Sequence, residues 1–436
     1  MEIAYRPLRI ALLGAGSVGS QVARLLIENK EELGLRVGAE LQLIGIAVRN
    51  LDSKRNADLP KELFTTDAET LINSADIVIE LMGGIDPARK YVTQALNSGA
   101  DVITANKALI AAHGTELLDL AEQLGAQLYY EAAVGGAIPI IRPLRESLAG
   151  DKVNKVMGIV NGTTNFILDR MESTGASFED ALKEAQDLGY AEADPTADVE
   201  AYDAASKAAI LASLAFHSEV PVEKVYREGI TKITALQIET AREAGYAVKL
   251  LAICERIEAT EEHPEGIVVR VHPTLIPDEH PLEAVRGAYN AVFVEAESAG
   301  QLMFYGAGAG GPETASAVLG DLVGAAKRWI AGGPGIADSV HANLEVLPVQ
   351  AISTRFQITL HVNDLPGVLA SIATVFALHG VSVETVDQNA ATKDSGALLT
   401  IMTHAASEKD LEAVVEDLHS NAAVQKVDSV IRVEGI

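Results

Sequence analysis

The sequence predicts an α/β protein in three parts: a doubly wound parallel sheet, an α+β middle domain and a small ferredoxin-like module. The first observation is an apolar run at residues 8–13 that leads through a glycine turn into an amphipathic helix. Short apolar strands then alternate with helices, which is typical of a parallel sheet. After a break in composition at residues 331–339, the order becomes strand, helix, strand, strand, helix, strand.

The composition excludes several classes of protein. A chain of 436 residues is long enough for two to three domains, and a net charge of −27 without a Lys/Arg cluster argues against nucleic acid and anionic membranes as partners. The sequence has no signal-peptide pattern and no apolar run of about 18 residues. The single cysteine, Cys254, lies in an apolar stretch that predicts a buried helix face. We therefore expect a soluble protein of the reducing cytoplasm.

The glycine turn GAGSVG at residues 14–19 follows the first strand, and a helix is predicted directly after it, over residues 20–33. In a dinucleotide fingerprint the first glycine allows the tight turn, the second lets the pyrophosphate approach and the third lets helix and strand pack. The phosphates would lie at the helix N-terminus, where unpaired N–H groups favour an anion. This Rossmann-type pattern predicts six cofactor contacts: Gly14, Ala15, Gly16, Ser17, Val18 and Gly19.

The end of the second apolar strand, residues 41–48, indicates which dinucleotide is bound. Domains specific for NAD usually carry an acidic residue there for the ribose 2′-hydroxyl, whereas an arginine suits the 2′-phosphate of NADP. Arg49 stands at this position, so NADP is favoured over NAD. Lys54 and Arg55 could assist, although a solvated loop is the simpler role for both.

Further candidate residues follow later strands of the same sheet. Ligands of doubly wound sheets collect at the carboxyl ends of the strands, where Gly83, Gly84 and Lys107 stand. Lys107 is therefore either a ligand contact or a surface lysine. The turn VGGAIP at residues 134–139 could aim several carbonyl groups at a hard cation, or could be a tight turn without an ion.

An acidic loop enters a helix in the segment GYAEADPTADVEAYDAASK, residues 189–207. Asp203 and Lys207 are four residues apart, so both project from one face of the predicted helix. Glu192, in the preceding loop, adds an anionic group suited to a substrate ammonium. The alternative is an exposed ion pair that contributes a few tenths of a kcal/mol to stability.

Eight segments between residue 8 and about residue 330 resemble, in the same order, the motifs of homoserine dehydrogenase. The family often has a proline where this chain has Ala307, which concerns the local loop only. The segments are GAGSVG, LMGGIDPARKYV, TANKALI, YYEAAVGGAIPI, NGTTNFIL, GYAEADPTADVEAYDAASK, HPLEAVRGAYNAV and YGAGAGGPETASAV.

The resemblance implies reversible NAD(P)H-dependent reduction of L-aspartate 4-semialdehyde to L-homoserine, in threonine, methionine and isoleucine biosynthesis. Lys207 and Lys107 match the two lysines that the family places at the reacting oxygen, and Glu192 and Asp203 match the acids near the substrate. In NGTTNFIL the candidates for polar substrate contacts are Asn161, Thr163 and Thr164, with structural hydrogen bonding equally open, and Gly162 is added to the substrate residues. Two glycines, Gly83 and Gly308, are added to the cofactor contacts. A monovalent cation, expected to be Na⁺, maps to Glu131 and to the carbonyls of Val134, Gly136 and Ile138.

The middle domain mixes strands and helices, including a helix predicted over residues 239–256 and a short one over 142–149. The family dimerises through the sheet of this domain, which implies a homodimer or homotetramer. We expect a nucleotide domain at 1–140 completed by 306–330, a substrate and dimerisation domain at 141–305, a linker at 331–350 and a last domain at 351–436.

The segment NDLPGVLASIATVFALHGVSVETVDQ at residues 363–388 resembles an ACT domain, a module that binds amino acids. The resemblance implies threonine as effector, bound at the turn that holds Asn363, Asp364 and Gly367. The alternative is a dimerisation module without a ligand. Because the linker separates the module from every catalytic motif, we expect its deletion to leave the reaction intact.

Three other classes fit the sequence less well. Phosphoglycerate dehydrogenase would need a histidine paired with a carboxylate, and none of the ten histidines lies in such a motif. A phosphate-acylating semialdehyde dehydrogenase would need a nucleophilic cysteine at a turn, unlike Cys254. An NAD(P)-sensing regulatory subunit would need neither NGTTNFIL nor a lysine in the cleft.

Overall fold

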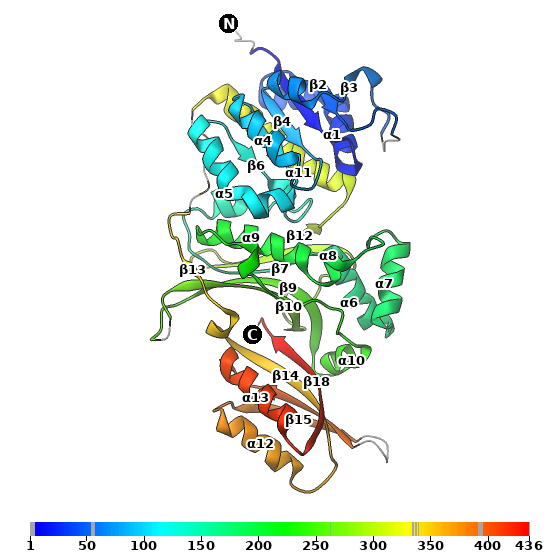
Figure 1. Ribbon diagram of the computed structural model, residues 1–436, viewed down its shortest axis with the longest axis vertical. Helices are drawn as coiled ribbons and strands as arrows, with labels where there is room; N and C mark the ends of the chain where they lie inside the picture. Colours follow the sequence, from blue (N-terminus) through cyan, green and yellow to red (C-terminus); the bar gives the residue numbers. More distant parts are fainter. Residues whose placement is uncertain are drawn as a thin grey trace. The chain divides into compact units, whose positions relative to one another are not determined.

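The computed structural model describes residues 5–53, 57–261, 263–333, 335, 338, 340–390 and 396–435, so Lys54 and Arg55 lie outside the described residues. The chain divides into two compact units, whose elements are labelled in Figure 1. The first unit comprises Met1–Gly162, Ser206–Glu223 and Tyr289–Leu344. The second comprises Thr163–Ala205, Lys224–Ala288 and Glu345–Ile436.

A six-stranded parallel sheet of order β3-β2-β1-β4-β5-β6 lies in the first unit, which confirms the doubly wound fold. Its strands are β1 (Leu8–Leu13), β2 (Leu41–Ala47), β3 (Phe64–Thr65), β4 (Ile77–Glu80), β5 (Asp101–Thr104) and β6 (Leu128–Tyr129). Its helices are α1 (Ser17–Glu28), α2 (Lys30–Val37), α3 (Ala68–Asn73), α4 (Ala88–Asn97), α5 (Lys107–Leu124) and α11 (Gly311–Ala331).

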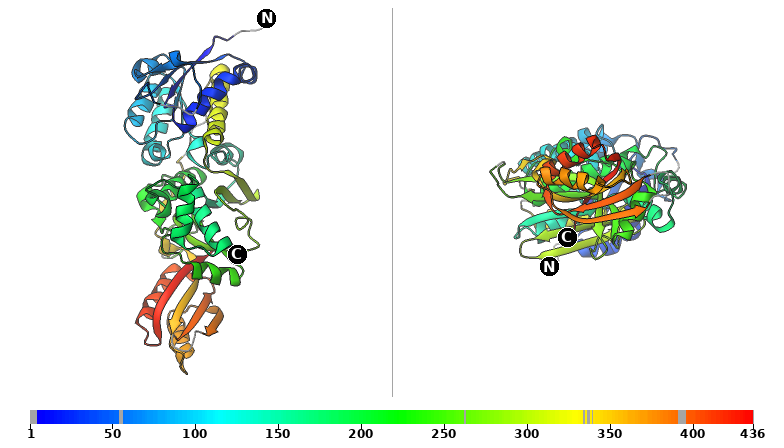
Figure 2. Two further views of the ribbon diagram at one scale, coloured as in Figure 1. Left: turned by 90° about the vertical axis from the view of Figure 1, so that its right-hand side faces the viewer. Right: turned by 90° about the horizontal axis from the view of Figure 1, so that it is seen from below.

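Helix α11 joins this domain from far along the chain. Figure 2 shows it, in yellow, beside α1 in dark blue. Its buried face, which includes Val318 and Leu322, shares one apolar core with Ile10, Leu12 and Val22. The apolar stripe of α11 therefore completes the core that the glycine turn rests on.

The helix predicted over residues 20–33 is two helices, α1 and α2. Asn29 ends the first with its backbone N–H bonded to the carbonyl of Leu25 and starts the second. Asparagine competes with helical hydrogen bonding and favours such positions.

Three antiparallel strands in the order β12-β11-β7 also belong to the first unit: β7 (Val153–Ile159), β11 (Tyr289–Ala296) and β12 (Gly300–Ala307). Strands β11 and β12 form a hairpin in which Asn290 pairs with Gly306. Helix α9 (Tyr202–Phe216) carries the unit boundary between Ala205 and Ser206.

The second unit contains a long antiparallel hairpin of β9 (Tyr246–Ile257) and β10 (Gly266–Pro277), and here the predicted helix at 239–256 is wrong. Only α10 (Ala235–Glu243) is helical; Gly245, with φ of 80°, follows it and the chain enters β9. The strand is buried on both faces over most of its length, so its apolar run shows no alternation and resembles a helix in sequence. Cys254 is buried as expected, but on a strand, and burial raises the pKa of its thiol to about 12.

Three further helices of this unit are α6 (Gly162–Thr174), which begins at the boundary, α7 (Phe178–Asp187) and α8 (Thr196–Val199). Short strands β8 (Tyr226–Arg227) and β13 (Glu345–Val346) pair with β10. No helix in the described part of the chain combines the length and hydropathy that a membrane crossing requires.

The C-terminal module has the predicted ferredoxin-like order, and its antiparallel sheet runs β18-β14-β16-β15. Its elements are β14 (Ser353–Val362), α12 (Val368–Leu378), β15 (Val383–Ala390), β16 (Ala397–Thr403), β17 (Ala406–Ser407), α13 (Glu408–Ser420) and β18 (Val424–Val433). Strand β18 also pairs with β10, Thr274 opposite Arg432. The buried guanidinium of Arg270, on β10, forms ion pairs with Glu255 and Glu434. The module is therefore joined to the middle domain by a strand pairing and a buried ion pair, not by the linker alone.

Candidate active site

The glycine turn meets the geometric demands of a dinucleotide site. Gly14 has φ of 100°, and a Cβ there would lie 2.6 Å from the carbonyl oxygen of Leu81. A Cβ at Gly19 would lie 2.2 Å from the carbonyl oxygen of Gly14, so only glycine lets α1 pack this closely. Gly16, the N-cap of α1, faces open space within 4 Å. That space is where a pyrophosphate would approach the helix N-terminus.

A cavity of ≈ 820 Å³ borders this turn. Of the predicted cofactor residues, Gly14, Ala15, Gly16, Arg49 and Gly83 line it, whereas Ser17, Val18, Gly19, Lys107 and Gly308 do not. Polar residues that the sequence prediction missed also line it: Asn50, Ser53, Asp86 and Tyr91. These four residues could have been predicted from their position after the ends of β2 and β4, where a doubly wound sheet binds ligands.

The ends of β4 and β5 are tied together by buried polar side chains. The Glu80 carboxylate accepts hydrogen bonds from the Thr104 hydroxyl at 2.7 Å and from the N–H of Met82 at 2.7 Å. Asn106 donates to the carbonyl of Gly84 at 2.6 Å and caps α5. Lys107, the first residue of α5, is exposed, and the capped helix start holds its backbone in place.

Lys207 and Asp203 occupy successive turns of α9, and both side chains are buried, with 8% and 6% of their surface exposed. This burial contradicts the alternative of an exposed surface pair. The Lys207 ammonium donates to the carbonyl oxygen of Val160, directly after β7, at 2.7 Å. The rigid helix and the carbonyl at the strand end therefore fix the position of the Lys207 Nζ.

The other predicted substrate residues differ in their surroundings. Asn161 is buried, as are residues 163–168 of α6. The Thr163 hydroxyl donates to the carbonyl of Tyr190 at 2.6 Å, which is the structural role left open for it. Gly162 begins α6. Glu192 is exposed in the loop after α7, and its backbone carbonyl accepts from Gln186 at 3.0 Å.

The turn after β6 combines a buried carboxylate with buried carbonyl groups. The Glu131 carboxylate accepts N–H groups of Ile140, Ile141 and Arg142 at 2.6, 2.8 and 3.0 Å. These bonds anchor a five-residue π-helix at Pro143–Ser147, where a longer helix over 142–149 was predicted. Gly136, with φ of 58°, packs so closely that a Cβ would lie 2.5 Å from the carbonyl of Gly308.

The carbonyls of Val134, Gly136 and Ile138 belong to buried residues, and within the described ranges no backbone N–H donates to them. Buried carbonyls with spare lone pairs are ligands suited to a hard monovalent cation. Among the described residues no group of three or more His, Cys, Asp or Glu is placed to hold a metal ion.

A second network ties the linker to the same turn. Arg145 and the hydroxyl of Tyr130 both bond to the carboxylate of Asp338, and the Arg145 guanidinium lies over the Tyr130 ring. Arg142 pairs with Asp321 on α11 at 2.6 Å, and burial raises the pKa of Asp321 to about 6 although Arg142 opposes the shift.

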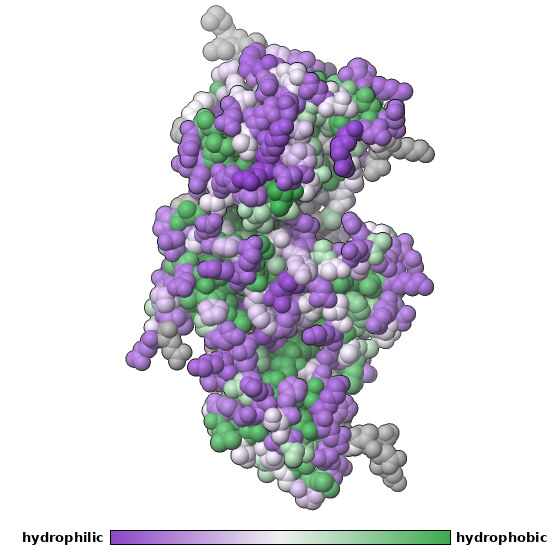
Figure 3. All heavy atoms as spheres, viewed as in Figure 1, coloured by the Kyte–Doolittle hydropathy of each residue, from purple (hydrophilic) through white to green (hydrophobic). Residues whose placement is uncertain are grey.

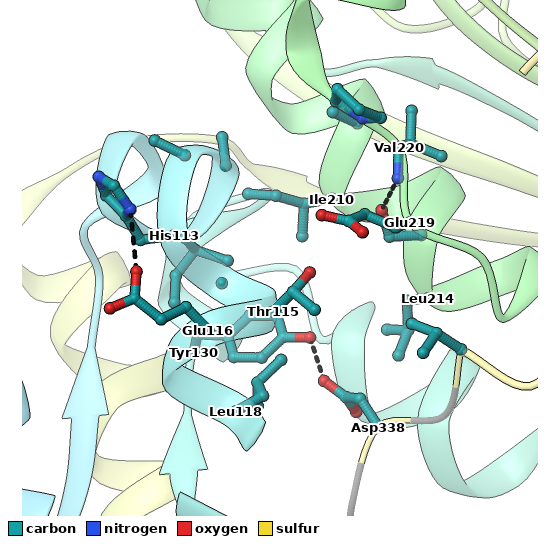
Figure 4. Close-up of a pocket in the computed structure, with 18 of the residues that line it drawn as sticks. His113, Thr115, Glu116, Leu118, Tyr130, Ile210, Leu214, Glu219, Val220 and Asp338 are labelled. Atoms are coloured by element: carbon teal, nitrogen blue, oxygen red, sulfur yellow. Dashed lines mark hydrogen bonds and ion pairs between the residues drawn. The ribbon is translucent and has the colours of Figure 1, made fainter. Parts of the chain in front are cut away.

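A cavity of ≈ 280 Å³ lies beside this network. Figure 4 shows Asp338 and Tyr130 at its wall with Ile210 and Leu214 of α9. None of the predicted cofactor, substrate or cation residues is among the described residues that line it.

In the C-terminal module, the predicted effector residues surround the start of α12. Gly367 is its N-cap, with φ of 92°. The Asn363 side chain donates to the carbonyl of Ala422 at 3.2 Å and accepts from Gln425 at 2.8 Å, so it braces the neighbouring loop. Asp364 is exposed.

Comparison with protein families supports this arrangement. The model of the homoserine dehydrogenase NAD-binding domain matches residues 14–131, that of homoserine dehydrogenase matches 139–323 and that of the ACT domain matches 356–423. The fold and these matches define an NAD(P)-dependent oxidoreductase with an ACT module.

Individual relatives identify the family. The homoserine dehydrogenase of Corynebacterium glutamicum is 53% identical over 427 residues, which are 98% of this chain and 95% of that protein. The crystal structure of a homoserine dehydrogenase from Thiobacillus denitrificans has a TM-score of 0.91 and 39% identity, covering 99% of both chains. A hyperthermophilic archaeal homoserine dehydrogenase in complex with NADPH has a TM-score of 0.61 and 28% identity, covering 75% of this chain and 99% of its own. The chain belongs to the homoserine dehydrogenase family.

Proposed function

We propose that the protein catalyses the reversible reduction of L-aspartate 4-semialdehyde to L-homoserine in amino-acid biosynthesis. The observation that carries the proposal is the buried ammonium of Lys207, held by the carbonyl of Val160 on a rigid helix. The family match supports the choice of substrate, which the dinucleotide site alone does not indicate.

A reduced nicotinamide bound beside the glycine turn would supply the hydride. As it reaches the aldehyde carbon, negative charge builds on the carbonyl oxygen, and the Lys207 ammonium stabilises that charge and donates its proton to complete the alcohol. Lys107 is proposed as the second cation at this oxygen, and its place after β5 supports that role. Asp203 and Glu192 are proposed to bind the substrate ammonium, with Asn161, Gly162 and Thr163 shaping the substrate side.

The test of the catalytic role is Lys207→Ala. Removing a positioned acid should lower kcat by about a hundredfold or more while the cofactor dissociation constant changes only a few-fold. Lys183→Ala, which removes an exposed lysine from α7, is the matched control and should leave kcat unchanged. Near-normal kcat in folded Lys207→Ala would refute the role.

The two acids are tested by Asp203→Asn and Glu192→Gln. Each should raise the KM for homoserine more than the KM for the cofactor, because each neutralises an anion proposed to face the substrate ammonium. A variant that mainly weakens cofactor binding would remove that residue from the substrate site.

We propose NADP as the preferred cofactor, with NAD as the weaker one. Arg49 supports this, since its cation lines the cavity beside the glycine turn. The proposed cofactor contacts are Gly14, Ala15, Gly16, Ser17, Val18, Gly19, Arg49, Gly83, Lys107 and Gly308.

We propose a Na⁺ site at the turn after β6, held by Glu131 and the carbonyls of Val134, Gly136 and Ile138. The spare carbonyl lone pairs support it, and the Glu131 carboxylate keeps the turn in shape. Such an ion would order the turn that contacts Gly308.

The regulatory proposal is feedback inhibition by threonine, bound at the turn that holds Asn363, Asp364 and Gly367. The ACT match supports a small-molecule effector. The proposed boundaries remain 1–140 with 306–330, 141–305, a linker at 331–350 and 351–436.

A homodimer or homotetramer is proposed through the β11–β12 edge. Exposed Tyr289, Met303 and Tyr305 support it, and the two tyrosine rings stack at 5.2 Å. Figure 3 shows further apolar surface, in green, on the C-terminal module, where Leu369 and Leu378 of α12 are exposed. A cytoplasmic location is proposed because the single thiol is buried and reduced.

A further inference from the structure

Asn290, on β11, is a buried amide at one edge of the β11–β12 hairpin. Only 1% of its surface is exposed, and neither its Nδ2 nor its Oδ1 has a hydrogen-bond partner among the described residues. The next four residues of the strand, 291–294, are buried and apolar. An unsatisfied buried amide costs stability, so a carboxamide here indicates a partner that arrives with a ligand.

The position of Asn290 is beside the proposed reaction centre. Its neighbour Ala291 pairs with Ile159, the residue before Val160, and the Val160 carbonyl holds Lys207. On its other side Asn290 pairs with Gly306 of β12. The Asn290 amide therefore lies on the strand between β7, whose end positions Lys207, and β12, which leads through glycines into α11.

That glycine segment lies directly against the Asn290 side chain, with no room for a side chain at Gly308. A Cβ at Gly308 would lie 2.0 Å from the Asn290 Nδ2, and the carbonyl of Gly308 lies against Gly136. A few residues on, a Cβ at Gly311 would lie 3.0 Å from the Ser17 Oγ of the dinucleotide turn. The segment thus borders both the glycine turn of the cofactor site and the turn proposed for the cation.

We propose that Asn290 is a further active-site residue whose carboxamide binds the carboxamide of the nicotinamide ring. The inference rests on the proposed function. The partner must offer an acceptor to Nδ2 and a donor to Oδ1, and a primary carboxamide offers both in one plane. Hydride leaves the ring carbon next to the one that bears this group, so the group must come near the oxygen that Lys207 serves.

The test compares NADPH with its reduced 3-acetylpyridine analogue, in which a methyl group replaces the carboxamide NH₂. Dissociation constants are measured by calorimetry, which does not require turnover. The wild-type protein should bind NADPH about tenfold more tightly than the analogue, because the analogue leaves the Asn290 Oδ1 unpaired. In Asn290→Leu the ratio of the two dissociation constants should fall to near unity, mainly because the variant binds NADPH more weakly.

The control is Gln357→Met in the C-terminal module, which removes another buried amide whose Nε2 lacks a partner. It should keep the tenfold preference. If Asn290→Leu does not fold, Asn290→Ala, which only removes atoms, replaces it.

Equal losses of affinity for both dinucleotides, or an unchanged preference with only a lower Tm, would overturn the assignment and leave Asn290 with a structural water. An error in the proposed function would show separately: the wild-type protein would not turn over homoserine, while its preference for NADPH over the analogue could still be measured.

Discussion

Arg49 is the residue on which cofactor choice depends. It is exposed directly after β2 and lines the cavity beside the glycine turn. Arg49→Glu should shift preference towards NAD, because a carboxylate repels the 2′-phosphate and can accept from a ribose hydroxyl. The kcat/KM ratio for NADP⁺ over NAD⁺ is the measurement, and a fall of tenfold or more is expected for exchanging an attractive for a repulsive charge (roughly 1.4 kcal/mol per tenfold).

The control for this charge change is Arg36→Glu, on exposed α2 away from the cavity lining. It should leave the ratio unchanged. An unaltered ratio in Arg49→Glu would mean that Arg49 points away from the phosphate.

Lys249 gives a prediction about pH. Its ammonium, 1% exposed in β9, donates to the carbonyl of Val285 at 2.8 Å, and burial lowers its pKa to about 8. The unfolded chain keeps the usual lysine value of about 10.4, so between these values the unfolded state binds more protons and stability rises with pH. The cost of burying the charge is full below pH 8 and disappears above about pH 10.

Lys249→Met removes this cost. Between pH 7.5 and pH 10.5 the wild-type protein should gain roughly 3 kcal/mol of unfolding free energy from this group, and the variant should not. The stability advantage of the variant over the wild-type protein should therefore shrink by that amount. Urea denaturation at each pH measures it. A pH-independent difference would show that Lys249 stays charged in the folded protein.

The candidate residues that the sequence alone predicts are those whose type and local spacing suit the chemistry. Lys207 and Asp203 are adjacent on one helix, and the glycine turn is continuous, so spacing sufficed. The sequence alone does not point to Asn290, because the proposed role of Asn290 depends on its closeness to Gly308 and on the pairing of β7, β11 and β12.

At the scale of elements, the parallel sheet and the C-terminal module follow from sequence, whereas β9 does not. Strands and helices of the parallel sheet are bounded by Gly, Asn and Pro, which mark their ends. Strand β9 is buried on both faces, and its partner β10 decides its conformation. A local pattern contains no information about that pairing.

The connection between the linker and the turn after β6 is another element that depends on distant contacts. Arg145 and Asp338 form an ion pair whose side chains are 7% and 11% exposed. Breaking one partner of a buried pair costs about 3–5 kcal/mol because the other charge stays buried. Arg145→Met and Asp338→Asn should each destabilise by that amount.

The double variant should cost much less than the sum, giving a coupling energy of about 2 kcal/mol or more by denaturation. The cycle of Arg36→Met and Glu32→Gln, an exposed i,i+4 pair, is the control and should give a coupling below about 0.5 kcal/mol. Additive losses at Arg145 and Asp338 would show that the linker is not held there.

At the scale of the whole molecule, the C-terminal module is not a detachable appendage. Deleting residues 345–436 would remove the β18–β10 pairing and Glu434, leaving Arg270 buried with fewer partners. The expectation that truncation leaves the reaction intact therefore does not suit this fold. We expect the truncated protein to be destabilised or insoluble.

A point change tests regulation more cleanly. Asp364→Ala, at the exposed turn before α12, should raise the threonine concentration for half-inhibition by about tenfold or more, because it removes a carboxylate proposed to bind the effector ammonium, and kcat without threonine should be unchanged. Glu416→Ala, an exposed acid on α13, is the control and should leave inhibition unaltered. Inhibition that persists in Asp364→Ala with purely competitive kinetics against homoserine would locate threonine in the substrate site instead.

The dinucleotide domain and the Lys207 helix are proposed to act together in the oxidation and reduction of one small amino-acid substrate. The most direct measurement is the absorbance of reduced nicotinamide when purified protein is mixed with L-homoserine and NADP⁺ or NAD⁺. We expect homoserine-dependent reduction of the dinucleotide that is faster with NADP⁺ and lost in Lys207→Ala. No homoserine-dependent reduction with either dinucleotide, in protein shown to be folded, would contradict it.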